Sequence, residues 1–595
     1  MKLEKKKYNI LDIIRIPLIY SSRESILVGI KYILDGIIPI LQVLVTAKFL
    51  DIAIQIFNHK KQFDDIIKPI IFMIVLLSYI WFSKNISEYL EICMSNKLRR
   101  TFRVDLIEKV ASLKYKYIEN ENSSNLISKV MKEPEVQCSD AYILILDMVQ
   151  LIIEVMGILI ILFSKVWWSA VLIVLISIPL FKLSLKSGSE IYETNRKVEG
   201  NKRRAKYLLE VLNNREFVEE RELFQYSKDI NKDWFEQFEI SRKSELKVSV
   251  KWFINMKLGG AIISILSIVI VFILIFPVVE GKITIGFFIS IVNSIFSLIN
   301  YMAWTLPQYG DNLAQNKEFL ADLSEFMFLD ENPEYLSIPS KERVNLKKLE
   351  FKNVFFKYPG TKNYILKDLS FVIEGGKNYA FVGSNGAGKT TITKLITGLY
   401  EEFEGEILIN DQSIKIYNQE ELKSMFSVVY QDFARYYISV KDNILLGDVS
   451  NDISLEKLYI AINNMDLNES IENLNNGLDS NLGKIKIDGV DLSGGQWQRI
   501  AMARSIINCA SLRILDEPTA ALDPISESNI YEKFHKISKN STTIFISHRL
   551  GSTKLADKIF VMEDGKIVES GSYKNLIAND GVYAKMYESQ RSWYK

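Results

Sequence analysis

Cysteine and histidine are scarce in this sequence of 595 residues, which has three of each. Cys93, Cys138 and Cys509 lie far apart and have no histidine nearby, so we expect reduced, buried thiols rather than a disulfide framework or a zinc site. An excess of one charge is also missing, because 73 Lys and Arg nearly cancel 72 Asp and Glu. No overall field is therefore expected to draw the chain to nucleic acid.

A small-residue cleavage site is missing from the basic, then apolar N-terminus, which predicts a retained helix along the membrane surface rather than a signal peptide.

The chain is longer than a single hydrophobic core usually supports, so two or more domains are expected. Long apolar runs end near residue 306, and a soluble α/β pattern begins near residue 345. We predict a membrane domain over residues 1–335 and a second domain over residues 336–595.

Six segments of the first domain are predicted to span a membrane as helices, each of which needs about 20 apolar residues. They cover about residues 20–50, 66–90, 139–163, 166–186, 254–279 and 283–308, with a very short loop at Ser164 and Lys165. The helix-like connections 83–139 and 184–250 are long and charged, which places them and both termini in the cytosol. Segments at their tips, near Tyr115 to Glu121 and near Asn213 to Glu219, are expected to dock onto the second domain.

Polar side chains share one face on each of two predicted membrane helices. On the first helix they are Lys31, Asp35, Gln42 and Thr46, and on the third they are Asp147, Gln150 and Glu154. Ionisable groups are costly in a membrane unless they face protein or water, so we predict that these stripes line a substrate cavity. The alternative is structural: Lys31 pairs with Asp35, and the acids lie where the third helix emerges into the cytosol.

A phosphate-binding loop pattern, GSNGAGKT, runs from Gly383 to Thr390 in the second domain, between the strand-like Tyr379 to Val382 and the helix-like Thr390 to Tyr400. Backbone N–H groups of such a loop wrap a phosphate, and the helix N-terminus adds its positive dipole end. Lys389 is expected to reach the β- and γ-phosphates of ATP, and Thr390 to ligate Mg²⁺. The predicted ATP-binding loop comprises Gly383, Ser384, Asn385, Gly386, Ala387, Gly388, Lys389, Thr390 and Thr391.

The apolar run Leu512 to Leu515 precedes two acids, Asp516 and Glu517. A buried strand here would deliver Asp516 to the metal and place Glu517 to activate a water against the γ-phosphate. The alternative is an acidic pair at the surface, opening a turn at Pro518.

Between these motifs, Leu492 to Gln496 has the sequence LSGGQ, which resembles the signature of ABC ATPases. Free N–H groups at the start of the following helix-like run could hold another phosphate. In the family, this loop (Ser493, Gly494, Gly495 and Gln496) serves an ATP bound to the partner subunit of a head-to-tail dimer. The whole chain is similar to ABC exporters, which implies an all-α six-helix polytopic transmembrane domain with long cytosolic helical extensions, followed by an α/β P-loop nucleotide-binding domain.

The resemblance implies further roles by position. Tyr358 would stack on adenine, and Gln431 would contact Mg²⁺ and report to the membrane domain. Asp523 would cross between subunits, and His548 would contact the γ-phosphate, whereas His59 and His535 are expected at the surface. The sequence departs from the family pattern in having Ile487, Asp488 and Gly489 where many exporters have Glu-Arg-Gly, Ala520 where Ser is common, and Arg513 within an apolar strand.

The runs LSGGQWQR, from Leu492, and LITGLY, from Leu395, resemble peptide exporters of the lantibiotic type, and about 20 residues before the first span leave no room for a protease domain. We therefore expect a homodimer that exports a peptide by alternating access, driven by ATP. The acidic stripe favours a cationic substrate, and the Lys- and Ile-rich composition suggests a bacterial plasma membrane. A multidrug or lipid exporter, a heterodimer and a regulatory ABC protein stay open as alternatives. The charge-free spans from Leu258 to Leu306 exclude a soluble ABC protein, and the fused domains argue against an importer.

Overall fold

The computed structural model describes residues 3–214, 217–301, 305–449, 453–486, 488–518, 524–537, 541–547 and 549–592. By their contacts they form two compact units, which are described separately. The first unit comprises Met1–Val110 and Asn125–Leu329, and the second comprises Ala111–Ser124 and Asp330–Lys595. The short segment Ala111–Ser124 therefore belongs with the C-terminal part of the chain.

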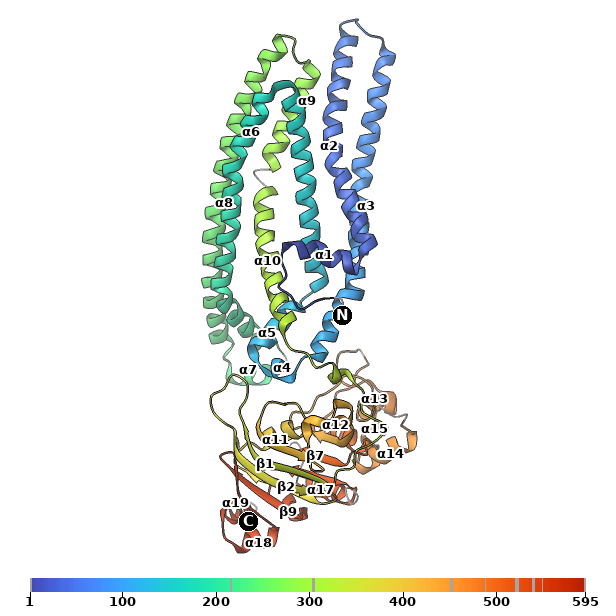
Figure 1. Ribbon diagram of the computed structural model, residues 1–595, viewed down its shortest axis with the longest axis vertical. Coiled ribbons are helices and arrows are strands. Elements are labelled where there is room, and N and C mark those ends of the chain that lie inside the picture. The colour runs from blue at the N-terminus through green and yellow to red at the C-terminus, as the bar shows by residue number, and fades with distance from the viewer. Residues whose placement is uncertain are drawn as a thin grey trace. The chain divides into compact units, whose positions relative to one another are not determined.

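The described residues of the first unit form helices joined by short connections, and its long helices run alongside one another (Figure 1). α6 packs mainly on α8 and α10, and α2 packs on α9 and α6. The helices are α1 (Ile10–Tyr20), α2 (Ser22–Phe57), η1 (Phe63–Ile66), α3 (Ile67–Ser112), α5 (Glu121–Val130), α6 (Pro134–Asn213), α7 (Val218–Phe224), α8 (Ser227–Val279), α9 (Ile285–Asn300) and α10 (Leu306–Phe328).

Three stretches of the part described are long and apolar enough to cross a membrane: Ser22–Phe57, Phe63–Ser112 and Pro134–Ser164. Two shorter apolar helical stretches, Ile268–Val279 and Ile285–Ser297, coincide with the predicted fifth and sixth spans. The helical membrane unit is thus confirmed, whereas the count of six spans stays a prediction.

α6 is helical throughout, including Ser164 and Lys165, where the sequence predicts a short loop. Even so, the N-terminal and C-terminal parts of α6 lie beside each other, as shown by Gln137 and Glu199, which line the same cavity. They are about 60 positions apart, which in a straight helix would separate them by about 90 Å. The ribbon of α6 accordingly turns back on itself (Figure 1). The predicted reversal is present, but it is a bend without a break in the helix.

The second unit contains two sheets. The antiparallel sheet has the order β2-β1-β4-β5, formed by β1 (Lys348–Phe356), β2 (Leu366–Glu374), β4 (Glu404–Ile409) and β5 (Gln412–Ser413). The other sheet has the order β10-β9-β3-β8-β7-β6, formed by β3 (Asn378–Gly383), β6 (Phe426–Val429), β7 (Leu512–Asp516), β8 (Thr542–Ile546), β9 (Lys558–Glu563) and β10 (Lys566–Gly571). Its strands are parallel except β10, and β3, β7 and β8 are fully buried, as expected for a parallel sheet covered on both faces.

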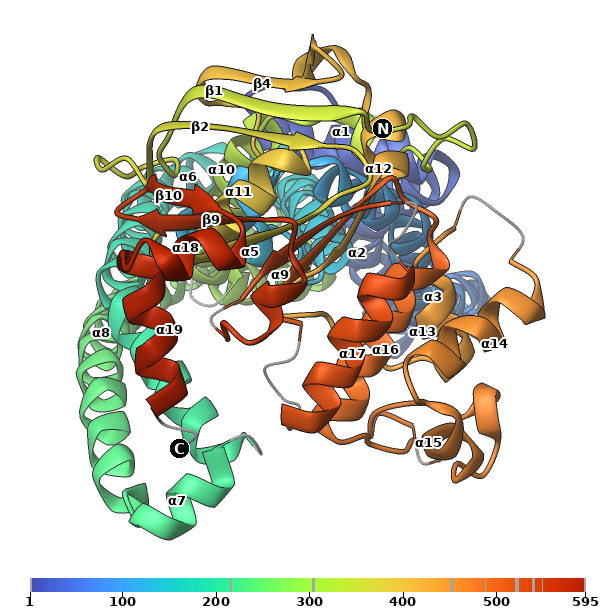
Figure 2. The same ribbon diagram turned by 90° about the horizontal axis from the view of Figure 1, so that it is seen from below.

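Helices and short 3₁₀ turns surround these sheets (Figure 2). They are α4 (Tyr115–Glu119), η4 (Pro333–Leu336), α11 (Lys389–Ile396), η5 (Ile414–Ile416), α12 (Gln419–Met425), α13 (Val440–Leu445), α14 (Leu455–Asn464), α15 (Asn468–Glu472), η6 (Gly477–Asp479), α16 (Gly494–Ile507), α17 (Pro524–Ile537), η8 (Ser552–Leu555), α18 (Tyr573–Ala578) and α19 (Val582–Ser592). The predicted α/β domain is confirmed.

The described residues of this unit form three hydrophobic clusters, of which two are the largest and the third lies around Tyr583. One of the two largest lies between the sheets, where the ring of Phe371 stacks on Phe351 with centroids 4.4 Å apart and meets Phe381 edge-on at 5.2 Å. The other surrounds the buried Trp497 of α16. Two sequence predictions about side chains are wrong: Cys509 is exposed rather than buried, and His535 is half-buried and hydrogen-bonded to Asn378.

Candidate functional site

The glycine-rich loop lies between the end of β3 at Gly383 and the start of α11 at Lys389. Gly388 precedes the helix with φ of 98°, a conformation that glycine adopts without a steric penalty. Lys389 is buried, and its Nζ donates hydrogen bonds to the carbonyl oxygens of Gly383, at 3.0 Å, and Ser384, at 2.9 Å. Burial lowers the pKa of Lys389, against the opposing influence of Glu517 and Asp516. The strand, loop and helix predicted for a phosphate cradle are therefore all present, although α11 ends at Ile396.

Asp516 ends the fully buried strand β7 and is itself inaccessible to solvent. The pKa of Asp516 is raised to about 6, chiefly by burial and also by the charge of Glu517, while the Thr390 hydroxyl and Lys389 act in the opposite direction. Neither of its carboxylate oxygens makes a well-formed hydrogen bond within the part of the chain described. A buried acid with unsatisfied oxygens next to a hydroxyl suits a divalent cation such as Mg²⁺. The alternative of an exposed acidic pair does not hold for Asp516.

Glu517 follows Asp516 directly and has a left-handed backbone, with φ of 47°. Such a conformation costs about 1–3 kcal/mol in a non-glycine residue and is concentrated at functional sites. The backbone N–H of Glu517 donates to Ile546 at 2.9 Å, which ties it to the neighbouring strand β8. Its carboxylate accepts a hydrogen bond of 2.9 Å from the side-chain amide of Gln431, which follows β6. Two predicted catalytic residues are thus in contact, while His548 and Asp523 lie outside the described residues.

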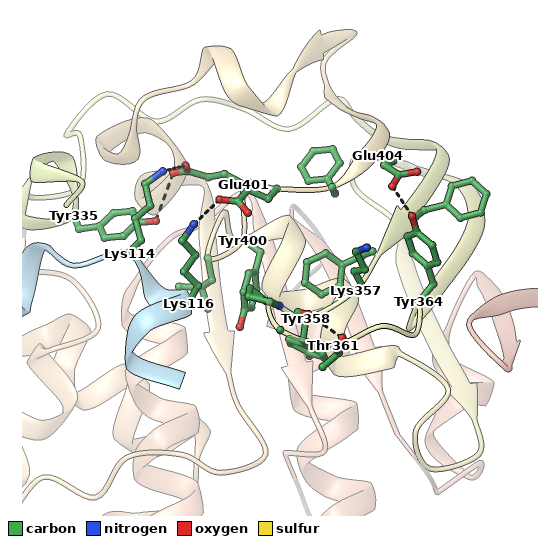
Figure 3. A pocket seen from close by; sticks show the side chains of 17 residues that line it. Lys114, Lys116, Tyr335, Lys357, Tyr358, Thr361, Tyr364, Tyr400, Glu401 and Glu404 are labelled. Carbon is green, nitrogen blue, oxygen red and sulfur yellow. Dashed lines mark hydrogen bonds and ion pairs between the residues drawn. The ribbon is translucent and has the colours of Figure 1, made fainter. Parts of the chain in front are cut away.

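Tyr358 is half-buried beside the P-loop helix, and its hydroxyl shares a hydrogen bond of 3.0 Å with Thr391. Its ring packs edge-on against Phe356 and Tyr400, with centroids 5.2 and 5.6 Å away. Tyr358 also lines a cavity of about 370 Å³, whose other walls include Lys114 and Lys116 of the segment Ala111–Ser124 (Figure 3). The predicted docking of this segment is therefore present within the second unit. The other predicted docking segment, 213–219, is only partly described.

The LSGGQ loop caps α16. The Ser493 hydroxyl accepts from the backbone N–H of Gln496 at 3.3 Å, and the Gln496 side chain accepts from the N–H of Ser493 at 2.9 Å. Ser493 and Gly494 are exposed, and α16 and α11 occupy separate places in the unit (Figure 2). This loop can thus present its N–H groups to another molecule. Of the departures from the family pattern, Ile487 and Ala520 lie outside the described residues, and Arg513 is buried with a hydrogen bond of 3.3 Å to Ser541.

In the first unit, a cavity of about 450 Å³ lies among α2, α3 and α6. It is lined by four of the seven residues of the two predicted stripes, Lys31, Asp35, Asp147 and Gln150, whereas Thr46 is not among its lining residues. Gln42 is exposed outside it, and Glu154 is buried elsewhere on α6, where it accepts a hydrogen bond of 2.9 Å from Tyr301.

The pairing of Lys31 with Asp35 is also present, so this part of the structural alternative coexists with the cavity. Asp35 accepts further hydrogen bonds from the hydroxyls of Tyr79, at 2.9 Å, and Ser83, at 2.7 Å. Sequence reasoning missed the α3 wall, although Tyr79, Ser83, Ser87 and Glu91 follow one another at the i, i+4 spacing of one helix face.

Comparison with known proteins gives a consistent result for both units. Residues 25–302 match the family "ABC transporter transmembrane region", and residues 366–520 match the family "ABC transporter". The chain is 31% identical over 579 residues to the subtilin transport ATP-binding protein of Bacillus subtilis, covering 94% of this chain and 90% of that protein. It is 30% identical over 517 residues to an ATP-dependent lipid A-core flippase of Legionella pneumophila, covering 85% of this chain and 84% of the flippase. A bacterial Atm1-family ABC exporter with ATP bound has the same fold, with a TM-score of 0.75 over 96% of this chain and 98% of that one at 21% identity.

Proposed function

Since the chain belongs to the ABC transporters, as an exporter-type half with its membrane region and ATPase fused, we propose that it exports a peptide across the bacterial plasma membrane by alternating access. The proposal of a peptide as the substrate rests on the similarity to the subtilin transport protein over 94% of the chain. A lipid is the second candidate, because the similarity to a lipid A-core flippase extends over 85%. Both termini are proposed to lie in the cytosol, where ATP is available.

We assign the ATP site to the contacts described above. Bound ATP supplies the phosphoanhydride bond whose hydrolysis drives transport. The loop N–H groups and Lys389 would hold its phosphates, and Thr390 and Asp516 would hold Mg²⁺. Glu517 orients water and accepts its proton, and the 2.9 Å hydrogen bond from Gln431 fixes the direction of the Glu517 carboxylate. Tyr358 stacks on the adenine base.

Roles for two residues outside the described part follow from the family resemblance alone: His548 contacts the γ-phosphate, and Asp523 crosses to the partner. A second copy of the chain completes each site. The exposed start of α16 supports this arrangement, because the capping contacts use the N–H groups of Ser493 and Gln496 and leave that of the exposed Gly494 for a phosphate held by another subunit. With the sequence motifs intact, we propose a homodimer with two working ATP sites.

The cavity among α2, α3 and α6 is the proposed contact for cationic groups of the cargo. Its acids Asp35, Glu88, Glu91 and Asp147 outnumber the lysines Lys31 and Lys84. Because Lys31 is already paired with Asp35, the remaining acids leave a net negative wall. In surroundings of low dielectric, such a wall attracts cations more strongly than it would in water.

The test is ATP-dependent uptake into inside-out vesicles that contain the purified protein. We expect accumulation of a cationic peptide with the wild type and none with Glu517→Gln. Glu532→Gln on the exposed surface of α17 is the matched control and should transport normally. If lipid alone stimulates ATP hydrolysis and no peptide is accumulated, the lipid becomes the favoured substrate. If Glu517→Gln hydrolyses ATP at the wild-type rate, Glu517 is not the catalytic residue.

A further inference from the structure

The segment Ala111–Ser124, called the docked segment below, is fastened to the ATPase unit by backbone hydrogen bonds. The N–H of Asn332 donates to the carbonyl of Ser112 at 2.7 Å, and the N–H of Lys114 donates to that of Asp330 at 3.2 Å. Two ion pairs add to this attachment, Lys114 with Glu401 at 3.1 Å and Lys116 with Glu402 at 2.6 Å (Figure 3). Glu402 is exposed and Glu401 is half-exposed, and solvated pairs of this kind contribute little stability by themselves.

Glu119 at the end of α4 makes a different kind of contact, in which both carboxylate oxygens are used. Oε1 accepts a hydrogen bond of 2.5 Å from Lys394, and Oε2 accepts one from the hydroxyl of Tyr400. Lys394 is largely covered, with 15% of its side chain exposed, and Tyr400 is buried. Glu119 is itself exposed, but both of its oxygens are used and its partners are shielded from water, so we expect this contact to be stronger than the two single ion pairs.

Lys394 joins Glu119 to Tyr358. Its ammonium lies 5.6 Å from the ring centroid of Tyr115 in the docked segment and 5.2 Å from that of Tyr358. A cation at this distance is attracted by the electron-rich ring faces. The Tyr358 ring also meets Tyr400, the second partner of Glu119, edge-on at 5.6 Å.

The short helix α11 carries both ends of this connection. Lys389 and Thr390 begin the helix at the phosphate loop, Thr391 bonds the Tyr358 hydroxyl, and Lys394 lies in its last turn. The orientation of the Tyr358 ring is therefore held by Thr391, Phe356, Tyr400 and Lys394. Tyr400 and Lys394, two of these four residues, are in turn hydrogen-bonded to Glu119.

We propose that Glu119 and Lys394 are positioning residues that hold the Tyr358 ring for the adenine base, so that ATP affinity depends on the attachment of the docked segment. This inference rests on the adenine role proposed for Tyr358. Coupling between two binding events is reciprocal, so ATP binding in turn strengthens the attachment of the docked segment. The sequence of the docked segment continues directly into α3 and α5, which connects the base site with the membrane helices by a route other than Gln431.

The experiment compares the binding of ATP with that of inorganic triphosphate to the full-length protein in lipid nanodiscs. Glu119→Gln is expected to raise the Kd for ATP about five- to ten-fold and to leave the Kd for triphosphate unchanged, since triphosphate has no base to stack. Tyr358→Ala should give a similar loss, and the double variant Glu119→Gln/Tyr358→Ala should lose no more than Tyr358→Ala alone. Lys394→Arg, which keeps the cation, should bind ATP better than Lys394→Gln.

Glu121→Gln is the matched control, because Glu121 is an exposed acid of the same segment outside the cavity beside Tyr358, and this change should alter the ATP Kd less than two-fold. Equal weakening of ATP and triphosphate by Glu119→Gln would overturn the inference, because it would indicate a general loss of structure. Unchanged ATP affinity in that variant would also overturn it, while leaving the proposed ATPase intact. A wild-type protein that binds neither compound would instead contradict the proposed function itself.

Discussion

Asp516→Asn is expected to stabilise the ATPase unit in the absence of Mg²⁺ while abolishing hydrolysis. The pKa of the buried Asp516 carboxyl is raised from 3.8 to about 6 by desolvation, so ionising it in the folded protein is costly. A shift of about two pKa units corresponds to about 3 kcal/mol, which the folded wild type loses at pH 8 relative to a neutral side chain of the same shape.

The pH dependence gives the sign of this effect. A carboxyl whose folded pKa is raised destabilises the folded state once the pH exceeds the unfolded pKa, and the destabilisation is complete above the folded pKa. The advantage of Asp516→Asn should therefore be full at pH 8 and fall to about half at pH 5, because the folded wild-type carboxyl is then protonated. At still lower pH it should disappear.

Thermal unfolding in EDTA at pH 8, 6 and 5 measures this trend, with Asp557→Asn as a control for a carboxyl whose partner is a backbone N–H. Addition of Mg²⁺ and ATP should reverse the order, because only the wild type can hold the cation at this position. An Asp516→Asn variant that is less stable than the wild type by the same amount at every pH would refute the desolvation argument.

Three further predictions concern single contacts. Glu517→Gln should lower ATP turnover by about 10²- to 10⁴-fold with little change in ATP affinity, measured as phosphate release and nucleotide binding; a matching loss of binding would point to a structural role. Trp497→Ala should destabilise the ATPase unit by about 3–5 kcal/mol, seen as a lower unfolding temperature, because this ring is only 1% exposed in the core around α16. Asp35→Asn alone should destabilise the first unit by about 3–5 kcal/mol, and adding Lys31→Gln should recover most of the loss, because the unpaired lysine is then removed as well; thermal unfolding in detergent that shows additive losses would contradict this pairing.

The ATP site was predictable from sequence because each of its parts is local. A strand, a glycine loop and a helix follow one another within about 20 residues, and Lys389 is held within the loop itself. The same holds for Asp516, whose burial follows from the apolar run before it. Continuity of helix at Ser164 was less predictable, because the charge of Lys165 and the reversal of direction both indicate a loop, whereas the backbone hydrogen bonds of a helix can persist through a bend.

Contacts between distant residues show where sequence patterns stop being informative. Glu119 and Lys394 are separated by 275 positions, and neither stands out among the charged residues around it. Their partnership depends on the chain leaving the membrane helices, touching the ATPase unit and returning, which no local periodicity encodes. The α3 wall of the membrane cavity differs from this case, because its polar residues do follow a helical spacing. They are difficult to notice in the sequence only because apolar residues stand between them. A polar stripe at i, i+4 spacing in an apolar helix therefore indicates a buried polar face even where the charges are few, whereas a single Glu–Lys pair between segments far apart in the sequence can be recognised only from the fold.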